Sequence, residues 1–171
     1  MKIRLVVLIL GIALLGCTQK RETKITVNER GQKIALGEMT QKELLAQFPP
    51  FRKAYSAYSP DSAAVDSLKR WNQDLDVMII LGTWCPDSRR EVGRFLRILD
   101  KAGNSHFHLQ FIGVDRKKKD PEGYAKKYKI ERVPTFIVLQ NGREIGRIVE
   151  RPKATLERDF LAILRRIKKS W

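Results

Sequence analysis

In the second half of this chain, short apolar runs typical of buried strands alternate with segments of helical periodicity. Val77–Leu81 is a short, continuous apolar run, as the central strand of a sheet is. Phe107–Val114 and Thr135–Leu139 are also expected to form strands. Between these runs, apolar residues at 92–99 fall at helical spacing, and Glu122–Lys129 is expected to form a short helix. This order predicts a mixed α/β sheet with helices on its faces.

The C-terminal end of the chain predicts a hairpin followed by a helix. Asn141-Gly142 is a strong turn signal between Thr135–Leu139 and a partner strand at Glu144–Val149. Thr155 is placed to cap a last helix. The apolar face of that helix would consist of Leu156, Phe160, Ile163 and Ile167.

The N-terminal half predicts a small hairpin and two helices. The hairpin would span 24–36 and turn at Asn28-Glu29-Arg30-Gly31. Thr40 and Glu43 form a capping box for a helix that Pro49-Pro50 is expected to stop. Ser59-Pro60 is expected to start a second helix, with Ser59 as the N-cap.

Composition sets limits on the kind of protein. The 171 residues suit one domain, and 34 Lys+Arg against 19 Asp+Glu give a formal charge of +15. The two cysteines can close at most one bridge, so neither a disulfide-stapled scaffold nor a zinc site built from cysteines is expected. We therefore expect no metal and no cofactor.

Residues 1–16 have the parts of a secretory signal peptide: a basic start, the apolar run Leu5–Leu15 and the small residue Gly16. In a helix, that run would cross only about half of the ~30 Å hydrocarbon core of a membrane. Leu14-Leu15-Gly16-Cys17 resembles the lipobox of bacterial lipoproteins, which implies cleavage before Cys17 and a lipid on its sulfur. The alternative is a chance cysteine at the end of an uncleaved apolar anchor.

We accordingly divide the chain into a signal peptide (1–16), a tether with the possible hairpin (17–36) and a folded domain (37–171). The lipobox predicts a lipoprotein of the bacterial cell envelope, attached to a membrane through Cys17, whose domain is exported to the periplasm or an equivalent extracytoplasmic space.

The segment 81–88, Leu-Gly-Thr-Trp-Cys-Pro-Asp-Ser, places Cys85 where a buried strand ends and a helix begins. If Cys85 is the N-cap, Pro86 occupies the first helical position, where its missing N–H costs nothing. The open amides and the positive end of the helix dipole then favour the Cys85 thiolate, which is the nucleophilic form. Asp87 opposes the thiolate through its charge, although it also complements the helix dipole.

Trp84-Cys85-Pro86-Asp87-Ser88 resembles the Trp-Cys-x-x-Cys motif of the thioredoxin family, with Ser88 in place of the second cysteine. Val133-Pro134-Thr135 is similar to the cis-proline loop of that family, and the following Phe-Ile-Val-Leu-Gln-Asn-Gly, hairpin and last helix match its C-terminal half. The resemblance covers residues 75–168. It implies a thioredoxin-like fold, with a mixed central sheet, helices on both faces and an N-terminal extension.

The resemblance also implies roles for the matching residues. Cys85 would be the nucleophile, and Ser88 would tune and solvate its thiolate. Pro134 would be cis and lie against Cys85, while Val133 would offer backbone hydrogen bonds to an extended substrate segment. The residues expected to bind the substrate are Trp84, Pro86, Asp87, Val133, Pro134 and Thr135.

Three departures from the family pattern concern activity. Ser88 cannot attack a mixed disulfide, as the second cysteine of a dithiol enzyme does. Ile79 stands six residues before Cys85, where many thioredoxins have a buried acid that serves as a proton relay. Glu150 replaces a glycine of the substrate groove, so the groove is expected to differ.

Other candidates fit better as surface features. His106 and His108 share one strand face but lack an evident third metal ligand. The basic run Arg116-Lys117-Lys118-Lys119 is expected to be a solvated loop, with binding of phosphates or an acidic partner as the alternative. The positive charge would also suit an anionic membrane surface, and nucleic acid is not expected as a partner.

Neither the peroxiredoxins, which use a lone reactive cysteine, nor the copper-delivery relatives of the thioredoxin fold match this chain. Peroxiredoxins have Thr or Ser three residues before the reactive cysteine, where this chain has Gly82. The copper-delivery relatives of the thioredoxin fold need a second cysteine beside the first.

Two functions remain. The first is an exported, lipid-anchored thiol–disulfide exchange protein of the monothiol isomerase or reductase type. Cys85 would form mixed disulfides with client proteins or small thiols, and an external thiol donor that the sequence does not identify would resolve them. The second is a non-catalytic thioredoxin-fold binding or scaffold lipoprotein that uses the same groove.

Overall fold

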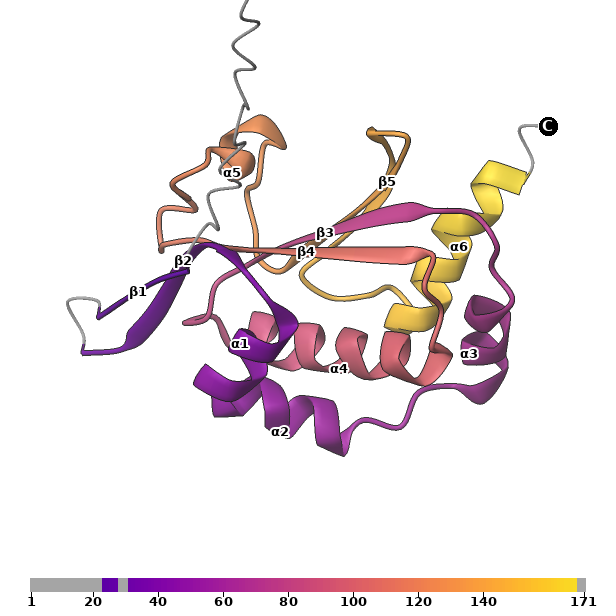
Figure 1. Ribbon diagram of the computed structural model, residues 1–171, viewed down its shortest axis with the longest axis horizontal. Coiled ribbons are helices and arrows are strands. Elements are labelled where there is room, and N and C mark those ends of the chain that lie inside the picture. The colour runs from indigo at the N-terminus through magenta and orange to yellow at the C-terminus, as the bar shows by residue number, and fades with distance from the viewer. Residues whose placement is uncertain (1–22, 28–30, 169–171) are drawn as a thin grey trace, which may run out of the picture.

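One six-stranded sheet with helices on both faces forms the body of the protein (Figure 1). The computed structural model describes residues 23–27 and 31–168, without the side chains of 167 and 168, so the predicted signal peptide and Cys17 lie outside the described residues. The elements in chain order are β1 (Lys24–Val27), β2 (Lys33–Met39), α1 (Gln41–Gln47), α2 (Pro49–Ala57), α3 (Ser62–Lys69), β3 (Leu75–Leu81), α4 (Pro86–Ala102), β4 (Phe107–Gly113), α5 (Tyr124–Lys127), β5 (Thr135–Gln140), β6 (Arg143–Val149) and α6 (Leu156–Lys168).

Strand β3 lies inside the sheet because it is apolar on both faces. The strand order is β1-β2-β4-β3-β5-β6, and β3 pairs parallel with β4 and antiparallel with β5. Val77 and Ile79 face a large core, whereas Met78 and Ile80 face a smaller one. The predicted mixed sheet is confirmed.

The two cores explain the layers of helices. Helices α2, α3, α4 and α6 cover the larger core, in which Phe95 packs against Phe136 and Phe160 with ring centres 4.8 and 5.3 Å apart. Ala125 of α5 and Ile130 beyond it cover the smaller core on the other face. Figure 1 shows α2 and α4 below the sheet and α5 above it. The expectation of helices on both faces is therefore confirmed.

The predicted N-terminal hairpin exists as the antiparallel pair β1–β2; residues 28–30 of its turn lie outside the described residues. Strand β2 crosses the boundary that we placed between residues 36 and 37 and also pairs with β4. In addition, the buried N–H of Ala35 donates to Thr83 Oγ1 at 3.1 Å. The hairpin is thus continuous with the main sheet and reaches the loop that carries Cys85.

Helix boundaries differ from the sequence expectations at two points. The capping box of Thr40 and Glu43 is confirmed, but Pro49-Pro50 also begins a new helix, α2, because proline suits the first helical turn. The N-cap of α3 is Asp61 rather than Ser59, since the Asp61 carboxylate accepts bonds from two backbone N–H groups of the first turn.

At the C-terminal end, the Asn141-Gly142 turn joins β5 to β6 through two residues with positive φ, as predicted. Thr155 Oγ1 accepts from Arg158 N at 3.3 Å at the start of α6. Leu156, Phe160 and Ile163 are buried on one face of α6, as expected; the side chain of Ile167 lies outside the described residues.

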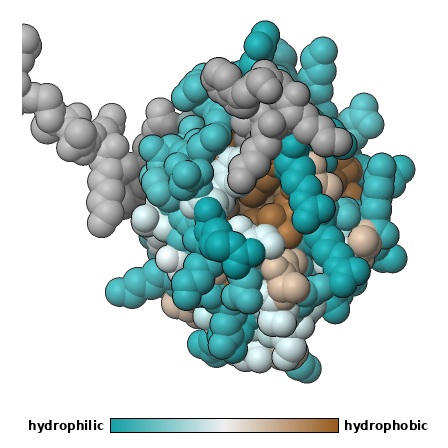
Figure 2. Space-filling model, turned by 90° about the vertical axis from the view of Figure 1, so that its right-hand side faces the viewer, coloured by the Kyte–Doolittle hydropathy of each residue, from teal (hydrophilic) through white to brown (hydrophobic). Residues whose placement is uncertain are grey.

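Figure 2 views the end of the molecule at which α3 and α6 lie. Hydrophilic residues cover most of this end, and hydrophobic residues show near its centre. None of the helices in the described ranges is both long enough and apolar enough to cross a membrane.

Candidate functional site

Cys85 begins α4 at the point where β3 leaves the sheet, as predicted. It is the N-cap residue, in an extended conformation, and Pro86 occupies the first helical position. Its N–H donates to Gly82 O at 2.9 Å, and its carbonyl accepts from Arg89 N at 3.0 Å. The residue is 8% exposed and belongs to the smaller core, against which Trp84 also packs. The sulfur therefore sits beside the first open amides of α4, near the surface.

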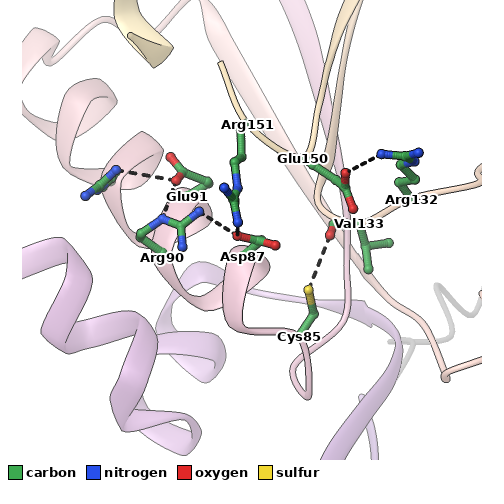
Figure 3. A network of polar contacts seen from close by, with 9 residues as sticks. Cys85, Asp87, Arg90, Glu91, Arg132, Val133, Glu150 and Arg151 are labelled. Atoms are coloured by element: carbon green, nitrogen blue, oxygen red, sulfur yellow. Dashed lines mark hydrogen bonds and ion pairs between the residues drawn. The ribbon is translucent and has the colours of Figure 1, made fainter. Parts of the chain in front are cut away.

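The predicted cis-proline loop lies directly against this sulfur (Figure 3). The Val133–Pro134 peptide bond is cis, and Cys85 Sγ donates to Val133 O at 3.3 Å. Thr135, expected to bind the substrate, is buried, and its hydroxyl donates to Arg132 O at 2.7 Å. Cys85, Val133 and Pro134 thus come together as expected, while the Thr135 side chain supports the loop from within.

Ser88, which was expected to tune and solvate the Cys85 thiolate, makes a hydrogen bond to the backbone of the Cys85 loop. Ser88 is fully buried, and its Oγ accepts from the buried N–H of Gly82 at 3.2 Å. No side-chain hydrogen bond caps α4 at Cys85 among the described residues. Ser88 therefore supports the backbone of the loop that carries Cys85, because its hydroxyl oxygen accepts the buried N–H of Gly82.

Trp84, which was predicted to form a wall of the site, packs against the smaller core that contains Cys85. Its Nε1 donates to Val114 O at 2.9 Å, and the guanidinium carbon of Arg116 lies 4.9 Å from its ring centre. A Cβ on Gly82 would come within 2.6 Å of this ring, so only glycine leaves room for the indole there. Pro86, next to Cys85, is exposed.

Asp87, in the first turn of α4, forms ion pairs with two arginines, one from α4 and one from the segment after β6 (Figure 3). Its Oδ1 lies 2.5 Å from Arg90 Nη2 and 3.1 Å from Arg151 Nη2. Partial burial acts to raise the pKa of Asp87, but the hydrogen bonds from Arg90 and Arg151 outweigh burial and lower its pKa below the ordinary value. The carboxylate stays ionised, and the two guanidinium groups offset the charge that would oppose the Cys85 thiolate.

Glu91, farther along α4, is buried although it carries an acidic group. Its Oε1 lies 2.6 Å from Arg90 Nε and 3.4 Å from Arg94 Nη1, whereas its Oε2 has no hydrogen-bond partner within the described part of the chain. Arg90 is thereby fixed between Asp87 and Glu91. The sequence alone did not point to Glu91, Arg151 or the Thr83 hydroxyl, because the role of each depends on contacts that the fold creates.

Glu150 keeps the backbone shape of the glycine that it replaces. Its φ of 56° lies in the left-handed region, and its N–H donates to Pro134 O at 2.7 Å. Its Oε2 lies 2.9 Å from Arg132 Nη1. Figure 3 places Glu150 and Arg132 on one side of the Cys85–Val133 contact and Asp87 on the other. Ion pairs therefore flank the Cys85–Val133 contact.

The weaker candidates lie apart from these contacts. His106 Nδ1 is 2.7 Å and His108 Nε2 is 3.6 Å from exposed Asp74 Oδ1, but the described residues contain no group of three or more such side chains arranged to hold a metal ion. The basic run 116–119 forms a turn in which Lys119 N donates to Asp115 Oδ1 at 2.8 Å.

The chain is similar in sequence to a known thioredoxin and similar in fold to a solved protein of unknown function. It is 25% identical over 107 residues to thioredoxin H9 of Arabidopsis thaliana, covering 61% of this chain and 72% of that protein. A protein of unknown function from Pseudomonas aeruginosa, solved by crystallography, superposes with a TM-score of 0.52 at 20% identity, covering 78% of this chain and 88% of the other. A thioredoxin from Nicotiana alata gives a TM-score of 0.39 at 24% identity, with 59% and 82% covered.

A sequence profile described as thioredoxin matches residues 25–161, and so includes the β1–β2 hairpin as well as the Cys85 loop and the cis-proline. The match is longer than the resemblance that the motifs alone suggested, and it agrees with the pairing of β2 with β4. Because the match covers most of the chain, this protein belongs to the thioredoxin family.

Proposed function

We propose that this protein is a thiol–disulfide exchange protein in which Cys85 is the only reactive thiol. Family membership supports thiol–disulfide redox chemistry in general. The observation that carries the finer proposal is the position of the Cys85 sulfur, at the open end of α4 and 3.3 Å from Val133 O beside cis-Pro134. Cys85 is the single free cysteine in the described part of the chain, and Ser88 occupies the position of a resolving thiol.

The exchange begins when the Cys85 thiolate attacks one sulfur of a client disulfide. A bond forms between Cys85 and that sulfur, the client disulfide bond breaks, and the second client sulfur leaves as a thiolate. When another client thiolate attacks the client sulfur of the mixed disulfide, Cys85 is released and the client is isomerised with no net oxidation. When a small external thiol attacks Cys85 instead, and a second thiol then regenerates Cys85, the client disulfide is reduced and the external thiol is oxidised.

We also propose that the domain acts outside the cytoplasm on a lipid anchor. This proposal is supported by the basic, apolar and small segments of residues 1–16 and by the lipobox-like Leu-Leu-Gly-Cys at 14–17. Mass spectrometry of the protein from its host envelope should find a mature chain that begins at Cys17 with a diacylglyceryl group. A chain that retains residues 1–16 when isolated would contradict the anchor.

Trapping in the host envelope tests the exchange function. Purified without reductant, wild-type protein should carry disulfide-linked clients on Cys85, and Cys85→Ser should carry none. Ser88→Cys supplies a second thiol that can attack the mixed disulfide, so it should lower trapping and form an internal disulfide with Cys85. Circular dichroism controls for folding of both variants. A free Cys85 thiol in every preparation, unreactive towards model disulfides, would contradict the proposal.

A second function is favoured by one observation: Cys85 is only 8% exposed, and its thiol is engaged by Val133 O. A binding or scaffold lipoprotein could use the groove without turnover. In that case Cys85→Ser would bind the same partners with unchanged affinity and would behave like wild type in the host.

A further inference from the structure

A groove rich in basic side chains runs between the edge strand β6 and helix α6. Its volume is about 290 Å³, its basic side chains belong to Arg147, Arg151, Lys153 and Arg166, and its apolar lining includes Ile148 and Val149. Val149 is 42% exposed, whereas Ile148 is only 5% exposed and packs in the larger core. The groove also contains one carboxylate, that of Asp159, which accepts from the backbone N–H groups of Lys153 and Ala154.

Arg151 joins this groove to the site of Cys85. It lines the groove and also bonds Asp87, two residues from the nucleophile. Its side chain is 69% exposed, and one carboxylate occupies only part of the five N–H donors of a guanidinium group. Arg166, which also lines the groove, lies ten residues beyond Leu156, the first residue of α6.

We propose that this groove binds an acidic segment of the same client polypeptide whose disulfide Cys85 attacks. The proposal rests on the exchange function and names its substrate class. Arg147 is paired with Glu144 and Arg151 with Asp87. Together with Lys153 and Arg166 they leave the groove basic beside the exposed Val149 side chain, which complements a peptide that carries carboxylates and an apolar side chain.

Three disulfide peptides test the preference. Each has one cysteine, activated by a chromogenic aromatic thiol, and flanks rich in Glu, Ser or Lys. With the full chain in a non-ionic detergent at 20 mM salt, the acidic peptide should release the aromatic thiol at least about 10-fold faster than the basic one. The ratio should fall towards one at about 1 M salt, where charges are screened.

Neighbouring arginines of α6 provide a matched control. Arg166 lines the basic groove, whereas Arg165 lines a separate cavity beside Asp61 and Ala64. Arg166→Glu should lower the preference for the acidic peptide roughly threefold or more, while Arg165→Glu, with the same change in net charge, should leave it nearly unchanged. Equal effects of the two variants would show that the preference comes from the overall positive charge, which would overturn the proposal. Equal rates for all three peptides would also overturn it, because they would show no preference for acidic flanks.

Binding without chemistry separates this proposal from the exchange function. Cys85→Ala should still bind the fluorescent acidic peptide, and Arg166→Glu should weaken that binding. If the Ser-flanked peptide does not react with Cys85, but Cys85→Ala binds the acidic peptide and Arg166→Glu weakens that binding, the proposed binding groove is supported and the exchange function is contradicted. If Arg166→Glu weakens binding to vesicles with 30% anionic lipid but not to the peptide, the groove faces a membrane and the proposal is wrong.

Discussion

Ser88 shows how one residue of the motif has a different use in this chain. Its hydroxyl lies where a resolving thiol would stand, yet it accepts the buried N–H of Gly82 at 3.2 Å. The same contact holds together the loop that ends in Cys85. Ser88 therefore makes a structural hydrogen bond at the position where a dithiol enzyme has its second cysteine. The first effect to measure for a substitution at Ser88 is the change in the free energy of unfolding.

Ser88→Ala should lower the free energy of unfolding by about 1–3 kcal/mol, because a buried N–H loses its acceptor. Urea denaturation at pH 7 measures the change. Ser67→Ala is the matched control, since the exposed Ser67 hydroxyl only donates to Ala63 O within α3, and the change there should stay within about 0.5 kcal/mol. Equal effects at the two serines would contradict the role assigned to Ser88.

Tyr58 is the residue whose ionisation reports most directly on the packing of the helices. Burial and the neighbouring Glu157 carboxylate raise its pKa from 10.0 to about 12. Its hydroxyl lies 3.0 Å from Glu157 Oε2, and Glu157 Oε1 also accepts from Asp61 N at 2.9 Å. The loop after α2, the N-cap of α3 and the first turn of α6 therefore meet at one buried carboxylate.

Tyr58→Phe should cost about 1.5–3 kcal/mol at pH 7, the range for a hydrogen bond to a charged group. Because the folded pKa lies above the unfolded one, this contribution is complete below pH 10 and is lost as the pH rises from about 10 to 12. Denaturation of both proteins at pH 7, 9 and 11 measures it. A difference that is the same at pH 7, 9 and 11 would refute the assignment. Tyr55→Phe, whose exposed hydroxyl bonds Asp100, should cost less.

At the scale of elements, the packing of α2 on α4 depends on Gly93. A Cβ built at Gly93 would lie 2.5 Å from Phe51 O and 2.8 Å from Ala54 Cβ. The two helices can approach this closely only because α4 has no side chain there. Alanine is normally the better helix residue by about 1 kcal/mol, so two effects compete at this position.

We expect packing to win over helix propensity. Gly93→Ala should destabilise the protein by about 1–3 kcal/mol net, since Phe51 O is backbone and can move only with α2. The free energy of unfolding from urea titration checks this, with unchanged helix content by circular dichroism as the control for folding. A more stable Gly93→Ala protein would show that α2 can shift away freely.

The elements also show what sequence patterns can and cannot predict. The strands from β3 onward, the Asn141-Gly142 hairpin and the Thr40 capping box were predictable, because hydrophobic period and turn chemistry act locally. Helix α2 was not predicted, because Pro49-Pro50 can both stop one helix and start the next. Ser59 and Asp61 are both good N-caps by residue type, and the contact of Asp61 N with Glu157 involves residues 96 positions apart.

For the site, local sequence predicted the position of Cys85 and Pro86, and family resemblance predicted cis-Pro134. Neither predicted where the Ser88 and Thr135 hydroxyls point, since each bonds a backbone group chosen by tertiary packing. The contact of Asp87 with Arg151 likewise joins α4 to the segment after β6. Sequence identifies the chemical groups of such a site, while the fold decides which of them reach the sulfur.

At the scale of the whole molecule, repulsion among the excess basic groups is the dominant long-range electrostatic effect. The formal charge is +15, and folding brings these charges closer together. Local ion pairs such as Arg158–Asp61, at 2.6 Å, act in the opposite sense, but exposed pairs are worth only about 0–1 kcal/mol each. Salt weakens both effects, so its net influence shows which one is larger.

We expect repulsion to be larger, so that raising NaCl from 20 to 300 mM increases the Tm by several degrees, which corresponds to about 1 kcal/mol for a domain of this size. Scanning calorimetry measures the shift. NaF at equal ionic strength should act like NaCl if screening is the cause, whereas a larger effect of sulfate at equal ionic strength would indicate binding of the anion to basic groups. A Tm that falls with NaCl would mean that ion pairs outweigh the net charge.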